Sequence, residues 1–241
     1  MKLNSLYVTF QGEANPFGIG HPAIFLRLQG CHLRCYKRTM GILCDTPEGL
    51  VKPKEHDEVM EIVNKTITLS KKTGVKVVTL TGGDPLWNSE EDLWKLLYEL
   101  TIAGLSVCVE TSGTISWLPY SNKFSSLYWV LDYKLASAGV KNADALFLDA
   151  DHLNDLSADD YIKFVVADEF DMVECITAIK RIQDKTSAKI CVGAFWGGKL
   201  STFEIFERLK SENLLARTII NAQLHKLVIA PNTNVKIPKE V

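Results

Sequence analysis

Buried strands and amphipathic helices alternate along most of this chain, and the alternation is the strongest constraint on its fold. From Glu55 onward the alternation is strict. The runs VKVVTLTGG and LSVCVETSG are almost continuously apolar, as strands buried on both faces of a sheet are. Segments 55–72 and 90–103 instead repeat apolar residues at helical spacing. This order predicts βα units around a parallel sheet.

The remaining elements extend the same pattern. Helices are expected at about 171–186 and 202–213, and strands at LYVTF, AIFLRLQG, SSLYWVLDYKL, ALFLD, IKFVVAD, AKICVGAF and QLHKLVIAP. About six βα units fit in 241 residues, whereas a complete eight-fold barrel with ordinary loops needs about 250. We therefore predict an α/β fold, a partial, open (β/α) barrel of about six parallel strands with helices outside. It would be a single domain over 1–241.

The residues that directly follow the predicted strands are the candidates for function. In such folds the carboxyl ends of parallel strands share one face, where the chemistry takes place. The segments at these ends are Gly30–Cys35, Thr81–Asp84, Glu110–Ser112 and Asp132–Lys134, followed by Asp168, Phe195 and His225. We expect them to converge on one site.

Charge and hydropathy argue against several classes of protein. The net charge is −2 and the pI about 6.2, so no broad basic face is expected, and no nucleic-acid or membrane partner. The N-terminal MKLNSLYVTFQGE lacks the apolar core of a signal peptide, and no run reaches the roughly 18 apolar residues of a membrane span. A cytoplasmic protein with reduced thiols is expected.

The stretch GCHLRCYKRTMGILCDT, residues 30–46, contains Cys31, Cys35 and Cys44. Clustered cysteines in a reducing compartment are more often metal ligands than disulfide partners. Three cysteines on a 4Fe–4S cluster would leave one iron open, whereas zinc would need a fourth ligand, for which His32 is the local candidate. Simple packing of small residues is a third reading. Cys108, Cys175 and Cys191 lie in apolar patterns that indicate core positions.

The cysteine loop and the later TGGDP resemble the radical S-adenosylmethionine superfamily. Those enzymes hold a 4Fe–4S cluster on a C-x3-C-x2-C loop, and the open iron binds S-adenosylmethionine. Here the spacing is C-x3-C-x8-C, and Leu43 replaces the usual aromatic residue before the last cysteine. Cys44 is followed by Asp45 and Thr46, and this CDT motif indicates that Cys44 is the third ligand, displaced along the chain by an insertion. We predict that residues 36–43 bulge outward and leave the cluster geometry intact.

A finer resemblance rests on an ordered set of motifs. QGE, PAIFLRLQGC, CDT, TGGDP, ETSGT, LDYKLASAG and QLHK follow one another as in the 7-carboxy-7-deazaguanine synthase family. The resemblance implies a lyase of 7-deazapurine (queuosine) biosynthesis that converts 6-carboxy-5,6,7,8-tetrahydropterin to 7-carboxy-7-deazaguanine. A 5′-deoxyadenosyl radical takes hydrogen from C6 of the pterin, and the ring contracts and loses ammonia. Magnesium assists at the substrate carboxylate.

The resemblance also implies the site residues. Cys31, Cys35 and Cys44 would hold the cluster, Thr46 would bind magnesium, and no catalytic residue is expected beyond the cluster-bound cofactor. S-adenosylmethionine would contact Gly82, Gly83, Asp84, Glu110, Ser112, Asp132, Tyr133 and Lys134. The pterin would contact Phe10, Gln11, Gly12, Glu13, Arg27, Thr81, His225 and, at the start of a C-terminal extension over 231–241, Pro231.

Two other functions stay open on the sequence. A different radical S-adenosylmethionine enzyme, such as a glycyl-radical activase, would share the cluster loop but not the early QGE with Arg27. A zinc-stabilised binding module would share only the cysteines. The preferred family further implies a homodimer and an electron donor such as flavodoxin or ferredoxin.

Overall fold

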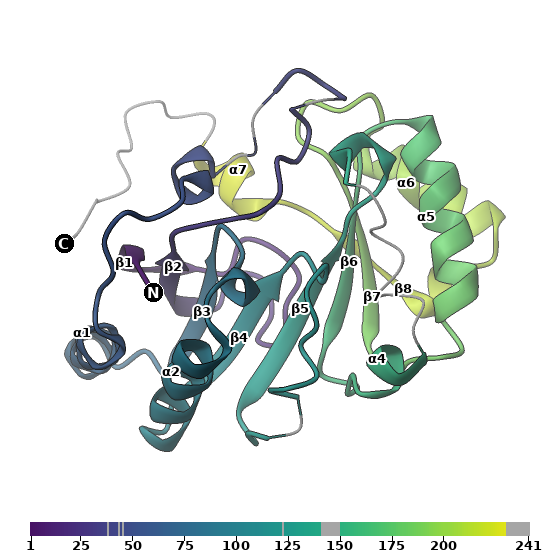
Figure 1. The fold of residues 1–241 in the computed structure, drawn as a ribbon. Coiled ribbons are helices and arrows are strands. Elements are labelled where there is room, and N and C mark those ends of the chain that lie inside the picture. Colours follow the sequence, from purple (N-terminus) through teal and green to yellow (C-terminus); the bar gives the residue numbers. More distant parts are fainter. Residues whose placement is uncertain (38, 43, 45, 122, 141–149, 230–241) are drawn as a thin grey trace.

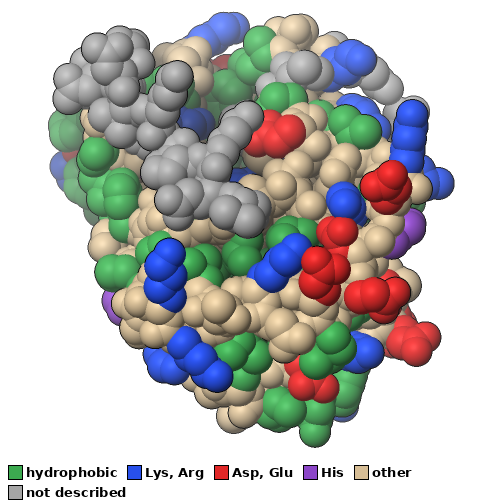
Figure 2. Space-filling model, turned by 90° about the vertical axis from the view of Figure 1, so that its left-hand side faces the viewer, with side chains coloured by type: hydrophobic (Ala, Val, Ile, Leu, Met, Phe, Trp, Pro, Cys, Tyr) green, Lys and Arg blue, Asp and Glu red, His purple; other side chains and the backbone are tan. Residues whose placement is uncertain are grey.

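The computed structural model describes residues 1–229 apart from residues 38, 43, 45, 122 and 141–149 (Figure 1). The predicted strand ALFLD and the C-terminal extension over 231–241 lie outside the described residues. No helix in the described part of the chain combines the length and apolar character that crossing a membrane requires. Figure 2 shows one face of the molecule, on which acidic and basic side chains both occur.

One open sheet organises the structure, with eight strands paired in chain order from β1 to β8. β1 pairs antiparallel with β2, and the six pairings from β2 to β8 are all parallel. The strands are β1 Leu3–Phe10, β2 Pro22–Leu28, β3 Val77–Gly82, β4 Ser106–Thr111, β5 Leu127–Tyr133, β6 Tyr161–Val166, β7 Lys189–Ala194 and β8 Thr218–Asn221. The predicted open α/β class is confirmed.

Helices cover the outer face of the curved sheet (Figure 1). The main ones are α1 Val59–Thr73, α2 Glu90–Ile102, α5 Glu169–Ile182 and α6 Thr202–Ser211, and α4 Ala150–Asn154 is a short helix before β6. The short α7 Leu224–Ile229 lies instead at the carboxyl end of the strands, where His225 and Lys226 line a cavity (Figure 1). Short 3-10 helices are η1 Pro47–Leu50, η2 Pro85–Trp87, η3 Ala136–Ala138 and η4 Leu215–Arg217. Local sequence sets several boundaries: the Ser89 and Asp168 side chains cap α2 and α5, and Gly74 ends α1 in the left-handed conformation.

The seven parallel strands agree with the predicted open barrel of about six, and β8 was not expected as a strand because TIIN is too short to show a pattern. Two expectations about single elements are wrong. QLHKLVIAP is not a strand, since Leu224–Ile229 forms α7 after β8. Short apolar runs do not distinguish strand from helix by periodicity. The alternation is also not strict, because the described residues between β4 and β5 contain no helix.

Alternate residues of each strand face different environments. Ile24, Leu26 and Leu28 of β2 are fully buried against the helices, and equivalent positions of the other strands join the same large core. The opposite, inner face has a smaller apolar cluster of Ala14, Cys108, Val130, Tyr161 and Cys191. Toward the carboxyl ends of the strands the inner face becomes polar, with Arg27, Thr81, Glu110, Asp132 and Lys163. The fold therefore supplies a polar surface at the end where function was expected.

Glycines let three backbone segments meet at this end. The Gly83 N–H donates to the Leu28 carbonyl, the Asp84 N–H to the Gly30 carbonyl (both 3.0 Å), and the Gly30 N–H to the Gly49 carbonyl (2.9 Å). A Cβ on Gly82, which has φ +132°, would collide with the Leu28 backbone. These contacts join the end of β3 to the start of the cysteine loop and to η1.

We expect Gly82→Ala to lower the free energy of unfolding by at least about 3 kcal/mol, because strain and overpacking act together. Gly104→Ala is the matched control, since Gly104 also has a positive φ (+79°) but no atom within 4 Å of an added Cβ. The control should cost only about 1–2 kcal/mol. Urea unfolding of both variants measures the difference, and equal losses would contradict the close approach.

Candidate active site

The described residues enclose a cavity of about 650 Å³ at the carboxyl ends of the strands. This volume is within the range of small-molecule sites. Of the residues that the family resemblance implies, all except Tyr133 and Pro231 line the cavity: Cys31, Cys35, Cys44, Thr46, Gly82, Gly83, Asp84, Glu110, Ser112, Asp132, Lys134, Phe10, Gln11, Gly12, Glu13, Arg27, Thr81 and His225. Asp168, also expected at this end, does not line it, because its side chain caps the N-terminus of α5. The structure thus brings together segments from both ends of the chain.

Tyr133 is the residue implied by the resemblance whose side chain does not reach the cavity. It lies on the outer face of β5, is 3% exposed and packs against Phe164 with ring centroids 4.9 Å apart. Strand alternation explains the difference, because Asp132 next to it points to the inner face. Pro231 lies outside the described residues.

The three loop cysteines line one side of the cavity. Burial raises the pKa of Cys31 to about 11 and also raises the pKa of Cys35, and the three thiols are close enough to affect one another electrostatically. Cys108 and Cys191 instead lie in the inner apolar cluster and Cys175 in the outer core, as expected.

The donor set fits a cluster better than a zinc ion. Three loop cysteines suffice for a cluster, in which each thiolate binds a different iron, whereas a structural zinc ion takes four ligands. His32 is engaged elsewhere, because its Nε2 lies 3.0 Å from the Thr114 hydroxyl and its ring stacks on Trp87.

The insertion after Cys35 does not simply bulge outward, and that expectation is wrong for Tyr36 and Ile42, which line the cavity. The Tyr36 N–H donates to the Ala138 carbonyl (3.0 Å), and its ring contacts Phe195 with centroids 4.7 Å apart. Tyr36 adopts a positive φ of 64°, which is uncommon for a bulky residue. The other described residues of the insertion, Lys37 and Thr39–Ile42, are exposed, so Tyr36 is the described residue of this stretch that is held inward.

Asp84 organises the end of β4. Its carboxylate accepts hydrogen bonds from the Leu86 N–H (3.1 Å), the Thr111 hydroxyl (2.7 Å), and the N–H and hydroxyl of Ser112. With 1% exposure and so many protein donors, this carboxylate positions Ser112 beside the cavity.

Charged side chains form a network across the cavity floor. Lys163 Nζ lies 2.8 Å from Glu13 Oε2 and 3.6 Å from Asp132 Oδ2, and Lys134 Nζ lies 2.8 Å from the same Asp132 oxygen. Gln223 donates to Glu13 Oε1 at 2.6 Å. Burial alone would raise the pKa of Glu13, but the Lys163 ammonium and these hydrogen bonds hold it below its usual value. Burial raises the pKa of Glu110, whose neighbours include Thr81, Arg27, Glu13 and Lys163.

Lys163, Gln223 and Tyr36 are cavity residues that the sequence reasoning missed. For Lys163 a signal existed, because a lysine inside the apolar run IKFVVAD resembles Arg27 inside IFLRLQG. Gln223 stands in the QLHK motif beside His225, which was a signal for it as well. For Tyr36 no comparable signal existed, since loop residues acquire their neighbours from tertiary structure.

The start of the chain is held against α7. Gln11 is 1% exposed and donates through Nε2 to the Thr79 hydroxyl (2.6 Å), and the Leu224 N–H donates to the Gly12 carbonyl (2.8 Å). The Arg27 Nε donates to the Tyr7 hydroxyl at 3.0 Å. Figure 1 shows α7 at the same end of the sheet as the loop after β2.

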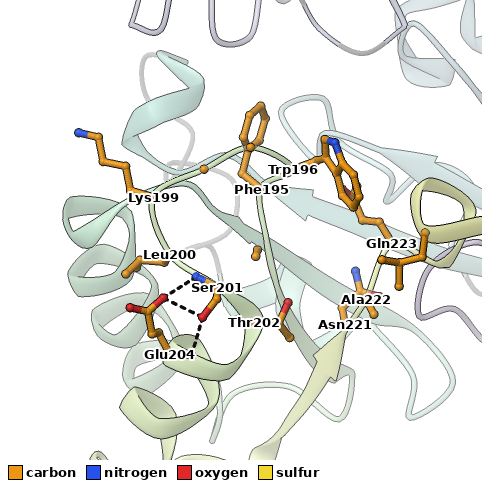
Figure 3. Close-up of a pocket in the computed structure, with 14 residues that line it drawn as sticks. Phe195, Trp196, Lys199, Leu200, Ser201, Thr202, Glu204, Asn221, Ala222 and Gln223 are labelled. Atoms are coloured by element: carbon orange, nitrogen blue, oxygen red, sulfur yellow. Dashed lines mark hydrogen bonds between the residues drawn. The ribbon is translucent and has the colours of Figure 1, made fainter. Parts of the chain in front are cut away.

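A smaller cavity of about 460 Å³ adjoins the first between the loop after β7 and the residues after β8 (Figure 3). The two cavities share Phe195, Trp196 and Gln223. Its Ser201 and Glu204 side chains form the reciprocal capping box of α6, with the Ser201 N–H 2.7 Å from Glu204 Oε2. These polar groups are therefore used in helix capping.

Comparisons with known proteins agree on one family. Residues 18–133 match the family model described as a 4Fe-4S single cluster domain. The chain is 31% identical over 231 residues to the 7-carboxy-7-deazaguanine synthase of Methanospirillum hungatei, covering 96% of this chain and 86% of the relative. It is 28% identical over 232 residues to that of Clostridium acetobutylicum, covering 96% and 97%.

The fold has a matching solved structure as well. The crystal structure of QueE from Escherichia coli superposes with a TM-score of 0.61 at 22% identity, covering 90% of this chain and 92% of that one. The level of identity to the Methanospirillum relative over almost the whole of both chains decides membership. This chain belongs to the 7-carboxy-7-deazaguanine synthase family.

Proposed function

We propose that this protein is a radical S-adenosylmethionine enzyme that converts 6-carboxy-5,6,7,8-tetrahydropterin to 7-carboxy-7-deazaguanine, with ring contraction and loss of ammonia. The observation that carries the proposal is the single cavity, which gathers three thiols, the Gly82–Gly83 turn and the early Gln11–Glu13 segment with Arg27. A glycyl-radical activase would account for the first two features but not the third.

Cys31, Cys35 and Cys44 would hold the cluster on one side of the cavity. When bound, the 4Fe–4S cluster would supply the electron that cleaves S-adenosylmethionine to the radical that starts the reaction. The chain's own contribution is to orient the cofactor: the Gly82 and Gly83 backbone, Ser112 held by Asp84, and the Asp132–Lys134 pair all face this side. Polar partners of this kind suit the amino, carboxylate and ribose groups of that cofactor.

The opposite side would bind the pterin. Glu13, kept ionised by Lys163 and oriented by Gln223, would accept hydrogen bonds from the guanidine-like edge of the ring. Arg27 would take the substrate carboxylate, because a guanidinium offers paired donors to it. Magnesium, with Thr46 as the protein ligand, would bind the same carboxylate, since Mg²⁺ keeps most of its coordination for water and substrate.

Tyr36 would extend the cofactor side with an aromatic wall. Its half-buried ring packs on Phe195, and its hydroxyl lies near the Lys134–Asp132 pair. An aromatic face at that place suits contact with a nucleoside base. In this proposal the enzyme works as a homodimer and receives electrons from a protein such as flavodoxin or ferredoxin; both parts rest on the family resemblance.

Each of Cys31→Ala, Cys35→Ala and Cys44→Ala should abolish the iron content of anaerobically reconstituted protein, because a cluster with two protein ligands is not held. Cys108→Ala, Cys175→Ala and Cys191→Ala should keep it. Iron and sulfide analysis with the visible absorbance spectrum measures both sets. Full iron content in Cys44→Ala would remove Cys44 from the ligand set.

Tyr36→Ala should weaken S-adenosylmethionine binding by about tenfold without loss of iron, because an aromatic contact is worth about 0.5–1.5 kcal/mol. Tyr36→Phe keeps the ring and should bind nearly as the wild type does. Tyr98→Ala, an exposed tyrosine on α2, is the control. Calorimetric titration of reconstituted protein gives the dissociation constants for S-adenosylmethionine. An unchanged dissociation constant for Tyr36→Ala would exclude a contact between the Tyr36 ring and the cofactor.

The proposed reaction is tested by incubating reduced, reconstituted enzyme with S-adenosylmethionine, magnesium and 6-carboxytetrahydropterin. We expect 7-carboxy-7-deazaguanine and ammonia in equal amounts, identified by mass spectrometry. Cleavage of S-adenosylmethionine without a deazaguanine product would show that the substrate is wrong while leaving the superfamily intact. A colourless protein that contains only zinc would overturn the proposal.

A further inference from the structure

Lys163 is a buried cation whose presence the proposed substrate contacts do not explain. It lies on the inner face of β6, it is 9% exposed, and Cys191 of β7 is its partner in the sheet register. Burying an ammonium group is costly unless it is paired. The Lys163 ammonium therefore needs carboxylate partners to offset the cost of burial, and the structure provides them.

Two carboxylates from separate segments meet at Lys163. Glu13, from the loop after β1, lies 2.8 Å from Nζ, and Asp132, at the end of β5, lies 3.6 Å from it. Glu13 belongs to the pterin side of the proposed site and Asp132 to the cofactor side. Lys163 is thus a direct connection between the two halves of the cavity.

The other charged groups around this connection are distributed unequally. Asp132 also has Lys134 at 2.8 Å, and Glu110 of β4 has Arg27 among its neighbours. Glu13 has Lys163 as its ion-pair partner, with Gln223 hydrogen-bonded and His225 of α7 close enough to act electrostatically. Loss of Lys163 would therefore affect Glu13 most.

We propose that Lys163 is a positioning residue that holds the Glu13 carboxylate in place as an acceptor for the pterin and ties it to Asp132 on the cofactor side. The inference rests on the proposed function. Lys163 need not touch either ligand, because it acts through the two carboxylates. It also explains how a buried glutamate can stay an acceptor, since burial by itself favours the protonated form.

The sign of the pH dependence follows from the same groups. In the wild type the pKa of Glu13 is below its usual value, so Glu13 stays ionised and adds no pH dependence to pterin affinity between about pH 6 and 8. In Lys163→Met the burial of Glu13 is no longer opposed by the ammonium, and its pKa rises. Pterin affinity of the variant should then fall as the pH falls and recover as the pH rises.

The experiment measures binding of 6-carboxypterin, an oxidised and fluorescent analogue, to reconstituted enzyme with S-adenosylmethionine present. Lys163→Met should bind about tenfold or more weakly at pH 6, since a hydrogen bond to a charged group is worth about 1.5–3 kcal/mol, and should partly recover at pH 8. Lys163→Arg should restore the flat profile. Lys189→Met, an exposed lysine at the start of β7, should bind as the wild type does.

A double-mutant cycle with Glu13→Gln separates the positioning role from a general loss of stability, which would weaken binding in both backgrounds. In Glu13→Gln no carboxylate remains to position, so adding Lys163→Met should cost less than twofold further. Additive losses, or a wild-type affinity and flat pH profile in Lys163→Met, would overturn the positioning role alone. Failure of the wild type to bind 6-carboxypterin would overturn the proposed substrate and this inference with it.

Discussion

The cavity depends on the mutual pairing of charges that the inner face of the sheet buries. Three carboxylates and three cations meet there, from Glu13, Glu110, Asp132, Arg27, Lys134 and Lys163. None would be stable at such a position alone, because an isolated buried charge costs several kcal/mol. The strand alternation that sends apolar residues to the helices places these groups side by side, so the same geometry that forms the core also builds the site.

Close backbone contacts hold the cysteine loop against the sheet. The ends of β2 and β3, the start of the cysteine loop and η1 meet through Gly30, Gly49, Gly82 and Gly83. A Cβ on Gly82 or Gly83 would collide with neighbouring backbone, and Gly30 has a positive φ of +109°. The loop is therefore anchored at its N-terminal side by hydrogen bonds, and at Tyr36 by the contact with Phe195 and the bond to Ala138. An insertion between the second and third cysteines is compatible with this arrangement because both anchors precede it or lie at its first residue.

The sequence predicted the class of the fold and the side of the sheet where the site lies. Thr81 and Asp132 were expected at this edge because they follow apolar strands, whereas Arg27 and Cys44 were named from the family resemblance; all four line the cavity. The outward position of the Tyr133 side chain could not be predicted, because motif position does not say which face of a strand a side chain occupies. The α7 segment was misread because six residues with mixed apolar character fit either a strand or a helix turn.

By itself, the sequence determined the apolar periodicity that gives β-strands and helices, the glycines that allow close backbone contacts, and the thiols and charges available for chemistry. Only the tertiary structure decided which of these meet: Lys163 with Glu13 and Asp132, Tyr36 with Phe195, and Asp84 with Ser112. These pairs are separated by tens of residues or more along the chain. Their contacts follow from strand order and register, which are set by packing of the whole sheet and not by any local pattern.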